Sequence, residues 1–164
     1  MKPPPPADGL TLRAWDDGDA AALIAVAADP ELRRWTSLRV TDETTAAAWL
    51  RTQQHGWRTG TRYAFAVLDD HGLVGHAALK RPDGEVGYWT AAAARGRGVA
   101  SRALELLTGW AFAEFPDLGQ LRLLHQVPNA ASCRVALKTG YAYAETYAAQ
   151  HPFPYDGHLH VRAR

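Results

Sequence analysis

The stretch Arg95-Gly96-Arg97-Gly98 combines residue types that bind anions. It lies between an expected strand, Glu85–Thr90, and an expected amphipathic helix, Gly98–Glu114. The first turn of a helix has backbone N–H groups without partners inside the helix, and glycine lets a ligand approach them closely. Arginine adds bidentate contacts to phosphate. The pattern therefore predicts a cradle for a phosphate or diphosphate, with a solvated basic loop as the alternative.

Two common phosphate-binding patterns are absent from the sequence. It contains no Gly-x-x-x-x-Gly-Lys-Ser/Thr, which argues against a P-loop NTPase. It also contains no Gly-x-Gly-x-x-Gly early in a strand–helix–strand unit, which argues against a dinucleotide-binding fold. The anion expected at the loop therefore belongs to another class of ligand.

Composition and charge indicate one globular domain over residues 1–164, with 47% apolar and 21% charged residues. A net charge of +1 argues against a nucleic-acid partner, and no apolar run approaches the ~20 residues of a membrane span. The single cysteine, Cys133, excludes an intramolecular disulfide and fits a cytoplasmic protein. The proline-rich residues 1–8 lack the pattern of a signal peptide and predict a flexible lead-in.

The hydrophobic pattern predicts a mixed α/β domain around one central sheet, in the order β-α-α-β-β-β-α-β-α-β-β. A first strand at Leu10–Arg13 is followed by a helix that begins with Asp16, Asp17 and Asp19 and by a helix over Ala46–Gln54 that ends near Gly56. The later elements are expected at Tyr63–Leu68, Leu73–Leu79, Glu85–Thr90, Gly98–Glu114, Leu121–Val127, Ala130–Lys138, Tyr141–Tyr147 and His158–Val161.

Three segments in this order resemble the GNAT N-acetyltransferase superfamily. Arg95-x-x-Gly98-x-Ala100 is similar to its Gln/Arg-x-x-Gly-x-Gly/Ala motif, and Asn129-x-x-Ser132-x-x-Val135-x-x-Lys138-x-Gly140-Tyr141 is similar to its Asn-x-x-Ser-x-x-Val-x-x-Lys-x-Gly-Tyr/Phe segment. The stretch from Gly84 to Trp89 resembles the strand before the acetyl-CoA loop in the Rim-type branch, which acetylates ribosomal-protein N-termini and other amines. Arg102 and Leu137 stand where acidic residues are common, and Ala92 stands where proline is frequent.

The resemblance implies a single-domain GNAT-like fold, with a mixed sheet of about seven strands and about four flanking helices. It also implies acetyl-CoA as co-substrate and no metal. The diphosphate would bind the N–H groups around the loop, the pantetheine arm would extend the sheet like an added strand, and Asn129 would bond the pantetheine or the amine region. The implied cofactor-binding residues are Trp89, Thr90, Arg95, Gly96, Arg97, Gly98, Val99, Ala100, Ser101, Asn129 and Ser132.

Two residues are the candidates for catalysis. The resemblance assigns Ser132 the protonation of the leaving thiolate. Glu85 is the carboxylate on the strand that enters the loop, and a partly buried carboxylate there suits a general base that deprotonates the amine. The alternative is that Glu85 only orders local hydrogen bonds. Glu145 and His160 are lesser candidates for the base.

Other reactive side chains have simpler interpretations. Cys133 follows Ser132, but neighbouring residues of a helix point in different directions, so we expect a structural cysteine and not a nucleophile. His158 and His160 share one strand face and could bind a metal. No Asp, Glu or Cys completes the ligand set nearby, so we expect solvated or hydrogen-bonded histidines and no metal site.

The expected function is transfer of an acetyl group from acetyl-CoA to a primary amine, by direct attack in a ternary complex. The amine could be a protein N-terminus or a small molecule, and the chain could be a monomer or a homodimer. A non-catalytic acyl-CoA-binding or sensor module is the alternative, and an RNA-binding protein is disfavoured by the charge. The segments 29–62 and 148–158 predict an aromatic acceptor pocket with few acids, from Trp35, Trp49, Trp57, Phe153 and Tyr155.

Overall fold

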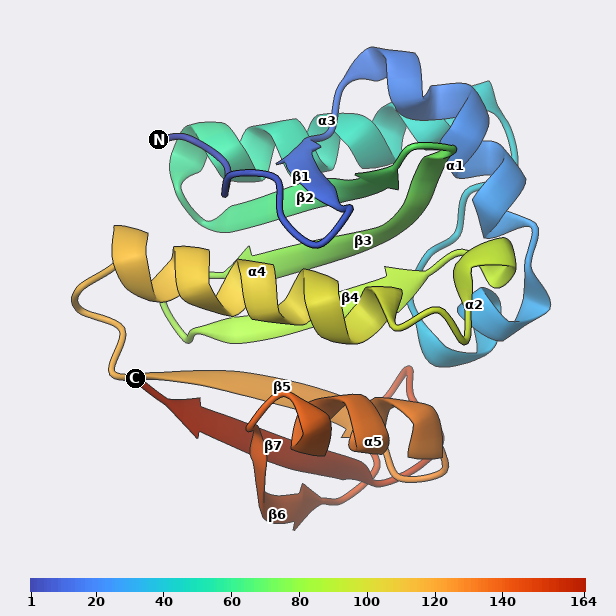
Figure 1. Ribbon diagram of the computed structural model, residues 1–164. Helices are drawn as coiled ribbons and strands as arrows, with labels where there is room; N and C mark the ends of the chain where they lie inside the picture. Colours follow the sequence, from blue (N-terminus) through green and yellow to red (C-terminus); the bar gives the residue numbers. More distant parts are fainter.

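The computed structural model describes residues 1–164 and contains one mixed sheet of seven strands (Figure 1). The order across the sheet is β1-β2-β3-β4-β5-β7-β6, and only the pair β4 and β5 is parallel. The strands are β1 (Thr11–Ala14), β2 (Arg62–Asp69), β3 (Gly72–Lys80), β4 (Glu85–Thr90), β5 (Gln120–Gln126), β6 (Ala142–Tyr147) and β7 (Gly157–Ala163). The predicted α/β class and the seven strands are confirmed.

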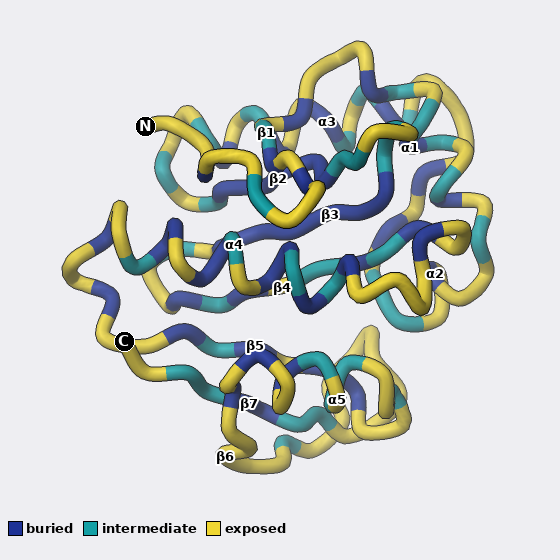
Figure 2. Tube along the Cα trace, in the orientation of Figure 1, coloured by how far each residue is buried: buried dark blue, intermediate teal, exposed yellow.

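Five α-helices flank the sheet: α1 (Ala20–Ala27), α2 (Pro30–Trp35), α3 (Glu43–Thr59), α4 (Val99–Glu114) and α5 (Ala130–Lys138). In Figure 1, α4 and α5 lie in front of the sheet and α3 lies behind it. A core of 22 buried residues lies between the sheet and α4, and a second core of 12 joins α1, α2 and α3 to the other face. The buried strands β2 and β3 therefore separate two apolar layers (Figure 2).

The helices near the N-terminus differ from the sequence prediction. Short helix α2 was not predicted, although Asp29 accepts a hydrogen bond from the N–H of Glu31 and Pro30 occupies the first turn, which are ordinary signals of a helix start. Helix α3 continues past Gly56 to Thr59 and ends at Gly60, whose φ of 70° is left-handed. Gly56 lies inside the helix, where α3 packs closely against β2, because a Cβ at this position would lie 2.8 Å from the Cβ of Arg62.

Strands β4 and β5 are hydrogen-bonded over only two residue pairs, Glu85 with Arg122 and Val86 with Leu123. Beyond these pairs the two strands diverge. The edge of β4 from Gly87 to Thr90 therefore has no partner strand on the β5 side, although β3 pairs with all of β4 on the other side. The sheet opens at its centre, next to the loop that leads into α4.

None of the helices combines the length and the apolar character that a membrane-spanning helix needs.

Candidate active site

A cleft of about 780 Å³ lies where β4 and β5 diverge. Its walls come from β4, β5, the loop before α4, the first turns of α4 and α5, and α2. The predicted cofactor residues that line it are Trp89, Thr90, Arg95, Gly96, Gly98, Val99, Ala100, Ser101, Asn129 and Ser132. Arg97 is the member of the predicted set that does not line the cleft. The fold thus brings two motifs that are separated in the sequence to one cavity.

The loop before α4 has free N–H groups. The backbone nitrogens of Gly96, Arg97 and Gly98 donate no backbone hydrogen bond, and no side chain caps the start of α4 at Gly98. Gly96 and Gly98 have φ values of 75° and 72°, which side chains with a Cβ rarely adopt, and a Cβ at either position would meet nothing within 4 Å. Open space above unpaired donors at a helix N-terminus fits an anionic ligand such as a diphosphate.

The two arginines of the loop have carboxylate partners. Arg95 forms an ion pair with Asp29 at the start of α2, and Nη2 of Arg97 lies 2.7 Å from Oδ2 of Asp69 at the end of β2. The hydrogen bond from the N–H of His71, together with that from Arg97, lowers the pKa of Asp69. These aspartates neutralise the cations and hold the loop in place. Direct contact of the guanidinium groups with a diphosphate stays a prediction.

The first turn of α5 presents Ser132 to the cleft. Oδ1 of Asn129 accepts a hydrogen bond from the N–H of Ser132 at 3.1 Å, so Asn129 is the N-cap of this helix. Both side chains line the cleft, and Ser132 is half-buried. Asn129 therefore has a structural role that sequence reasoning did not assign, and its predicted contact with pantetheine is untested.

Two polar side chains of the cleft have buried atoms without hydrogen-bond partners. These are the hydroxyl of Tyr88 on β4 and both amide atoms of Gln126 at the end of β5. Burial raises the pKa of Tyr88 to about 12, against the opposing effect of the nearby Ser132 side chain. The phenol is therefore protonated at neutral pH and can donate a hydrogen bond. Unpaired buried polar groups are costly, so these atoms fit the polar parts of a ligand.

Tyr88 was not among the residues predicted for catalysis. The alternation of side chains along β4 was visible in the sequence and places Tyr88 on the same strand face as Val86, which packs against α4. The divergence of β4 from β5, which leaves the Tyr88 hydroxyl without a partner, was not visible.

Glu85 lies at the start of β4, at the end of the strand far from the loop. Its side chain lines the cleft, but it is 41% exposed and forms an ion pair with Lys80 on β3. The residue is partly buried, as expected, but the neighbouring strand supplies a cation to its carboxylate. Its role as general base is untested.

The lesser candidates for the base lie away from the cleft. Glu145 on the edge strand β6 is exposed and accepts a hydrogen bond from the hydroxyl of Tyr147 at 2.7 Å. His160 on β7 is fully buried beneath α5. Neither lines the cleft, whereas His125 on β5 does.

The structure corrects the expectation that no further ligand lies near His158 and His160. His125 and Cys133 lie beside them, and the potential ligand atoms of all four residues are within 4.8 Å of one another. Burial lowers the pKa of both His125 and His160, which favours neutral imidazoles. The sequence could not indicate this cluster, because it depends on the register between β5 and β7.

The end of the cleft near α2 and α3 is aromatic. Of the predicted aromatic residues, Trp35, Trp49 and Phe153 line the cleft, whereas Trp57 packs in the core and Tyr155 lies outside the lining. Trp89 also lines it. His76 was not predicted. Its ring stacks on Trp89 with centroids 5.4 Å apart, its Nδ1 accepts a hydrogen bond from the Trp15 indole at 3.1 Å, and burial lowers its pKa to about 3.

The fold is similar to that of several acetyltransferases of known structure. The chain superimposes on RimL, an α-N-acetyltransferase of a ribosomal protein, with a TM-score of 0.88. The two sequences are 18% identical, and the match covers 97% of this chain and 96% of RimL. In that structure, coenzyme A is bound to RimL and forms a disulfide with a cysteine of RimL. The chain also superimposes on MccE, a microcin self-immunity acetyltransferase in complex with acetyl-CoA and AMP (TM-score 0.87, 14% identity, 96% and 94%). A third match is RimJ of Mycobacterium smegmatis with a coenzyme A disulfide (TM-score 0.84, 21% identity, 94% and 81%).

A search with the sequence against curated proteins found no significant match. The model of the acetyltransferase (GNAT) domain family, in contrast, matches residues 9–142, which include the loop before α4, the whole of β4 and β5, and all of α5. The predicted resemblance is confirmed, and the chain belongs to the GNAT acetyltransferase family.

Proposed function

We propose that this chain is an acetyl-CoA-dependent N-acetyltransferase that acts on a primary amine by direct attack in a ternary complex. The observation that carries the proposal is the continuity of one cleft from the free N–H groups of Gly96–Gly98 to the open edge of β4. An anion site and an unpaired strand edge suit the diphosphate and the amide-containing pantetheine arm of coenzyme A. Complexes of RimL and MccE with coenzyme A or acetyl-CoA support this assignment.

The reaction needs the thioester carbonyl, the amine and a proton donor in one place. The neutral amine nitrogen attacks the carbonyl carbon, the C–S bond breaks, and the sulfur leaves as a thiolate that takes up a proton. Ser132 and Tyr88 both line the cleft, and their hydroxyls are the groups that we propose to supply or relay that proton. Before the attack, the ammonium form of the substrate must lose a proton to a base, for which Glu85, acting through water, is our proposal.

We propose that the amine binds at the end of the cleft near α2, and the residues that line the cleft there indicate what kind of amine fits. The aromatic walls of this end suit an acceptor with apolar or flat groups beside the amine, and Glu31 is the acid on α2 that lines the cleft there. RimL modifies the α-amino group of a ribosomal protein. We therefore place the chain in the Rim-type branch and propose an N-terminal peptide amine as the first acceptor to test.

The test is a screen of amines with detection of free thiol and mass spectrometry of the product. Peptides with a free N-terminus would be compared with the same peptides blocked by acetylation, and with polyamines and free amino acids. Release of coenzyme A together with a product heavier by one acetyl group supports the proposal. Tight binding of acetyl-CoA without transfer to any amine would indicate a non-catalytic acyl-CoA-binding module instead.

A further inference from the structure

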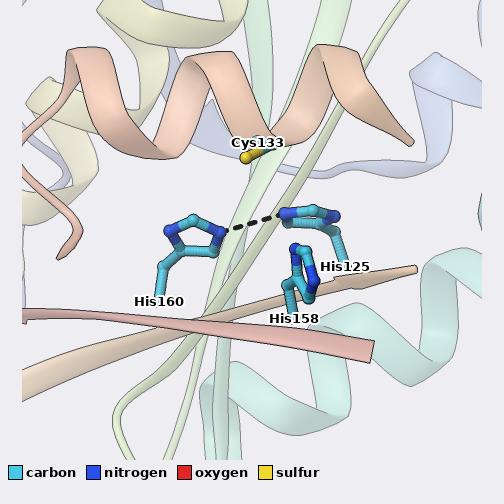
Figure 3. Close-up of side chains that lie close together, drawn as sticks. All are labelled: His125, Cys133, His158 and His160. Carbon is cyan, nitrogen blue, oxygen red and sulfur yellow. Dashed lines mark hydrogen bonds between the residues drawn. The ribbon is translucent and has the colours of Figure 1, made fainter. Parts of the chain in front are cut away.

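Four potential metal ligands from three elements meet beneath α5. His125 lies on β5, His158 and His160 lie on β7, Cys133 lies on α5, and their ligand atoms are all within 4.8 Å of one another (Figure 3). Strand register produces the cluster, because His125 is the direct cross-strand partner of His158, and His160 follows on the same face of β7. Three imidazoles and a thiol are thus brought together by the backbone of the sheet and the helix that covers it.

The hydrogen bonds of two imidazoles fix where their protons lie. Nδ1 of His125 is 2.9 Å from the carbonyl oxygen of Gln126, and Nδ1 of His160 is 3.2 Å from the carbonyl oxygen of Tyr141. A carbonyl oxygen only accepts, so both Nδ1 atoms carry the hydrogen, and in the neutral form of each ring Nε2 presents a lone pair. The two Nε2 atoms are nevertheless only 3.1 Å apart (Figure 3). Two lone pairs at this distance repel each other, and a cation between them would remove the repulsion.

We propose that His125, Cys133, His158 and His160 bind one divalent transition-metal ion of the Zn²⁺ type. In metal sites, a histidine commonly binds the metal through one ring nitrogen and donates the N–H of the other to a backbone carbonyl, which orients the ring. Imidazole and thiolate favour Zn²⁺ or Co²⁺, whereas Mg²⁺ and Ca²⁺ require oxygen ligands. Four N and S ligands make a closed tetrahedral set, which is typical of a structural site. A proton shared between His125 and His160 is the competing way to relieve the repulsion.

The proposed metal site does not depend on acetyl transfer, although His125 also lines the cleft and Cys133 directly follows Ser132. Cys133 and His158 are half-buried, and His125 borders the cleft, so an ion can reach the cluster. A bound ion would link β5, β7 and α5. It would therefore hold the first turn of α5, which carries Ser132, against the sheet.

The test is a titration of the reduced protein with Co²⁺, followed by competition with Zn²⁺. We expect binding of one ion per chain, visible bands of tetrahedral Co²⁺, and a near-ultraviolet sulfur-to-metal band that Zn²⁺ displaces. C133S should abolish the sulfur band. H158N should weaken Co²⁺ binding at least about tenfold, the lower limit for removal of a group that merely orients a ligand. H55Q, which changes an exposed histidine on α3, is the matched control and should leave both quantities unchanged.

The proposal is overturned if the sulfur band is absent in the wild type, or if C133S and H55Q give the same titration. It is also overturned if Co²⁺ binds with equal affinity to the wild type and to H158N. Circular dichroism and acetyl-CoA affinity show whether each variant is folded. His160 is fully buried, so its substitution could unfold the protein, and C133S and H158N are used instead. Failure of acetyl transfer with intact Co²⁺ binding would contradict the proposed function and leave the metal site standing.

Discussion

Substitution of Gly98 by valine tests the placement of the cofactor. Gly98 has a φ of 72°, and its N–H and those of Gly96 and Arg97 donate no backbone hydrogen bond at the N-terminus of α4. Each hydrogen bond from such a donor to a charged phosphate contributes about 1.5–3 kcal/mol. Loss of one of them by a shift of the backbone, or by a valine side chain in the cradle, should weaken coenzyme A binding roughly 10- to 150-fold.

The assay is calorimetric titration with coenzyme A and, separately, with pantetheine, which lacks the diphosphate. G98V should weaken coenzyme A binding and leave pantetheine binding unchanged. G72V is the control for backbone strain, because Gly72 at the start of β3 also has a positive φ, 116°, and lies outside the cleft. Equal affinity of wild type and G98V for coenzyme A would refute the placement, and an equal loss in G72V would assign the effect to folding.

Four further substitutions test the remaining roles by steady-state kinetics. S132A should lower kcat by about 10²-fold or more with little change in acetyl-CoA affinity, and wild-type kcat would reduce Ser132 to a helix-start residue. Y88F removes the phenol that is protonated below a pKa of about 12 and should lower kcat at neutral pH, whereas unchanged kcat would make Tyr88 a wall residue. E85Q should lower kcat and recover in part at high pH, where more amine is already neutral; no recovery would assign Glu85 a structural role. D69N releases Arg97 and should raise the KM for acetyl-CoA more than it lowers kcat, and unchanged KM would show that this ion pair does not position the loop.

The parts of the site that consist of residues adjacent in the chain could be predicted from the sequence. The anion loop, the left-handed Gly98 and the helix that follows depend on residues adjacent in the chain, so their pattern could be read directly. The same holds for the α5 segment with Ser132. The ion pairs that hold the loop could not be read, because Asp29 is 66 positions from Arg95 and Asp69 is 28 positions from Arg97. From the sequence, a bound anion was the only partner that could be inferred for the two arginines near the helix N-terminus.

Strand register explains what sequence reasoning missed around the histidines. The spacing of His158 and His160 shows that they share a face, but no local pattern shows which residues of β5 lie opposite. Pairing of His125 with His158, and the position of α5 above them, bring in the two further ligands. The same limit applies to Glu85, whose exposure and contact with Lys80 follow from the pairing of β4 with β3.

The divergence of β4 and β5 links these features to function. An unpaired strand edge in the interior of a sheet leaves backbone donors and acceptors without partners, which costs free energy and invites unwanted pairing. The open edge here includes Tyr88 and continues into a loop with free N–H groups, and the buried polar atoms of Tyr88 and Gln126 also have no partners. Unsatisfied groups along one path are best explained by a single elongated ligand with polar groups at intervals. Acetyl-CoA has that form, since it carries a diphosphate, amides along the pantetheine arm and a thioester at the end of that arm.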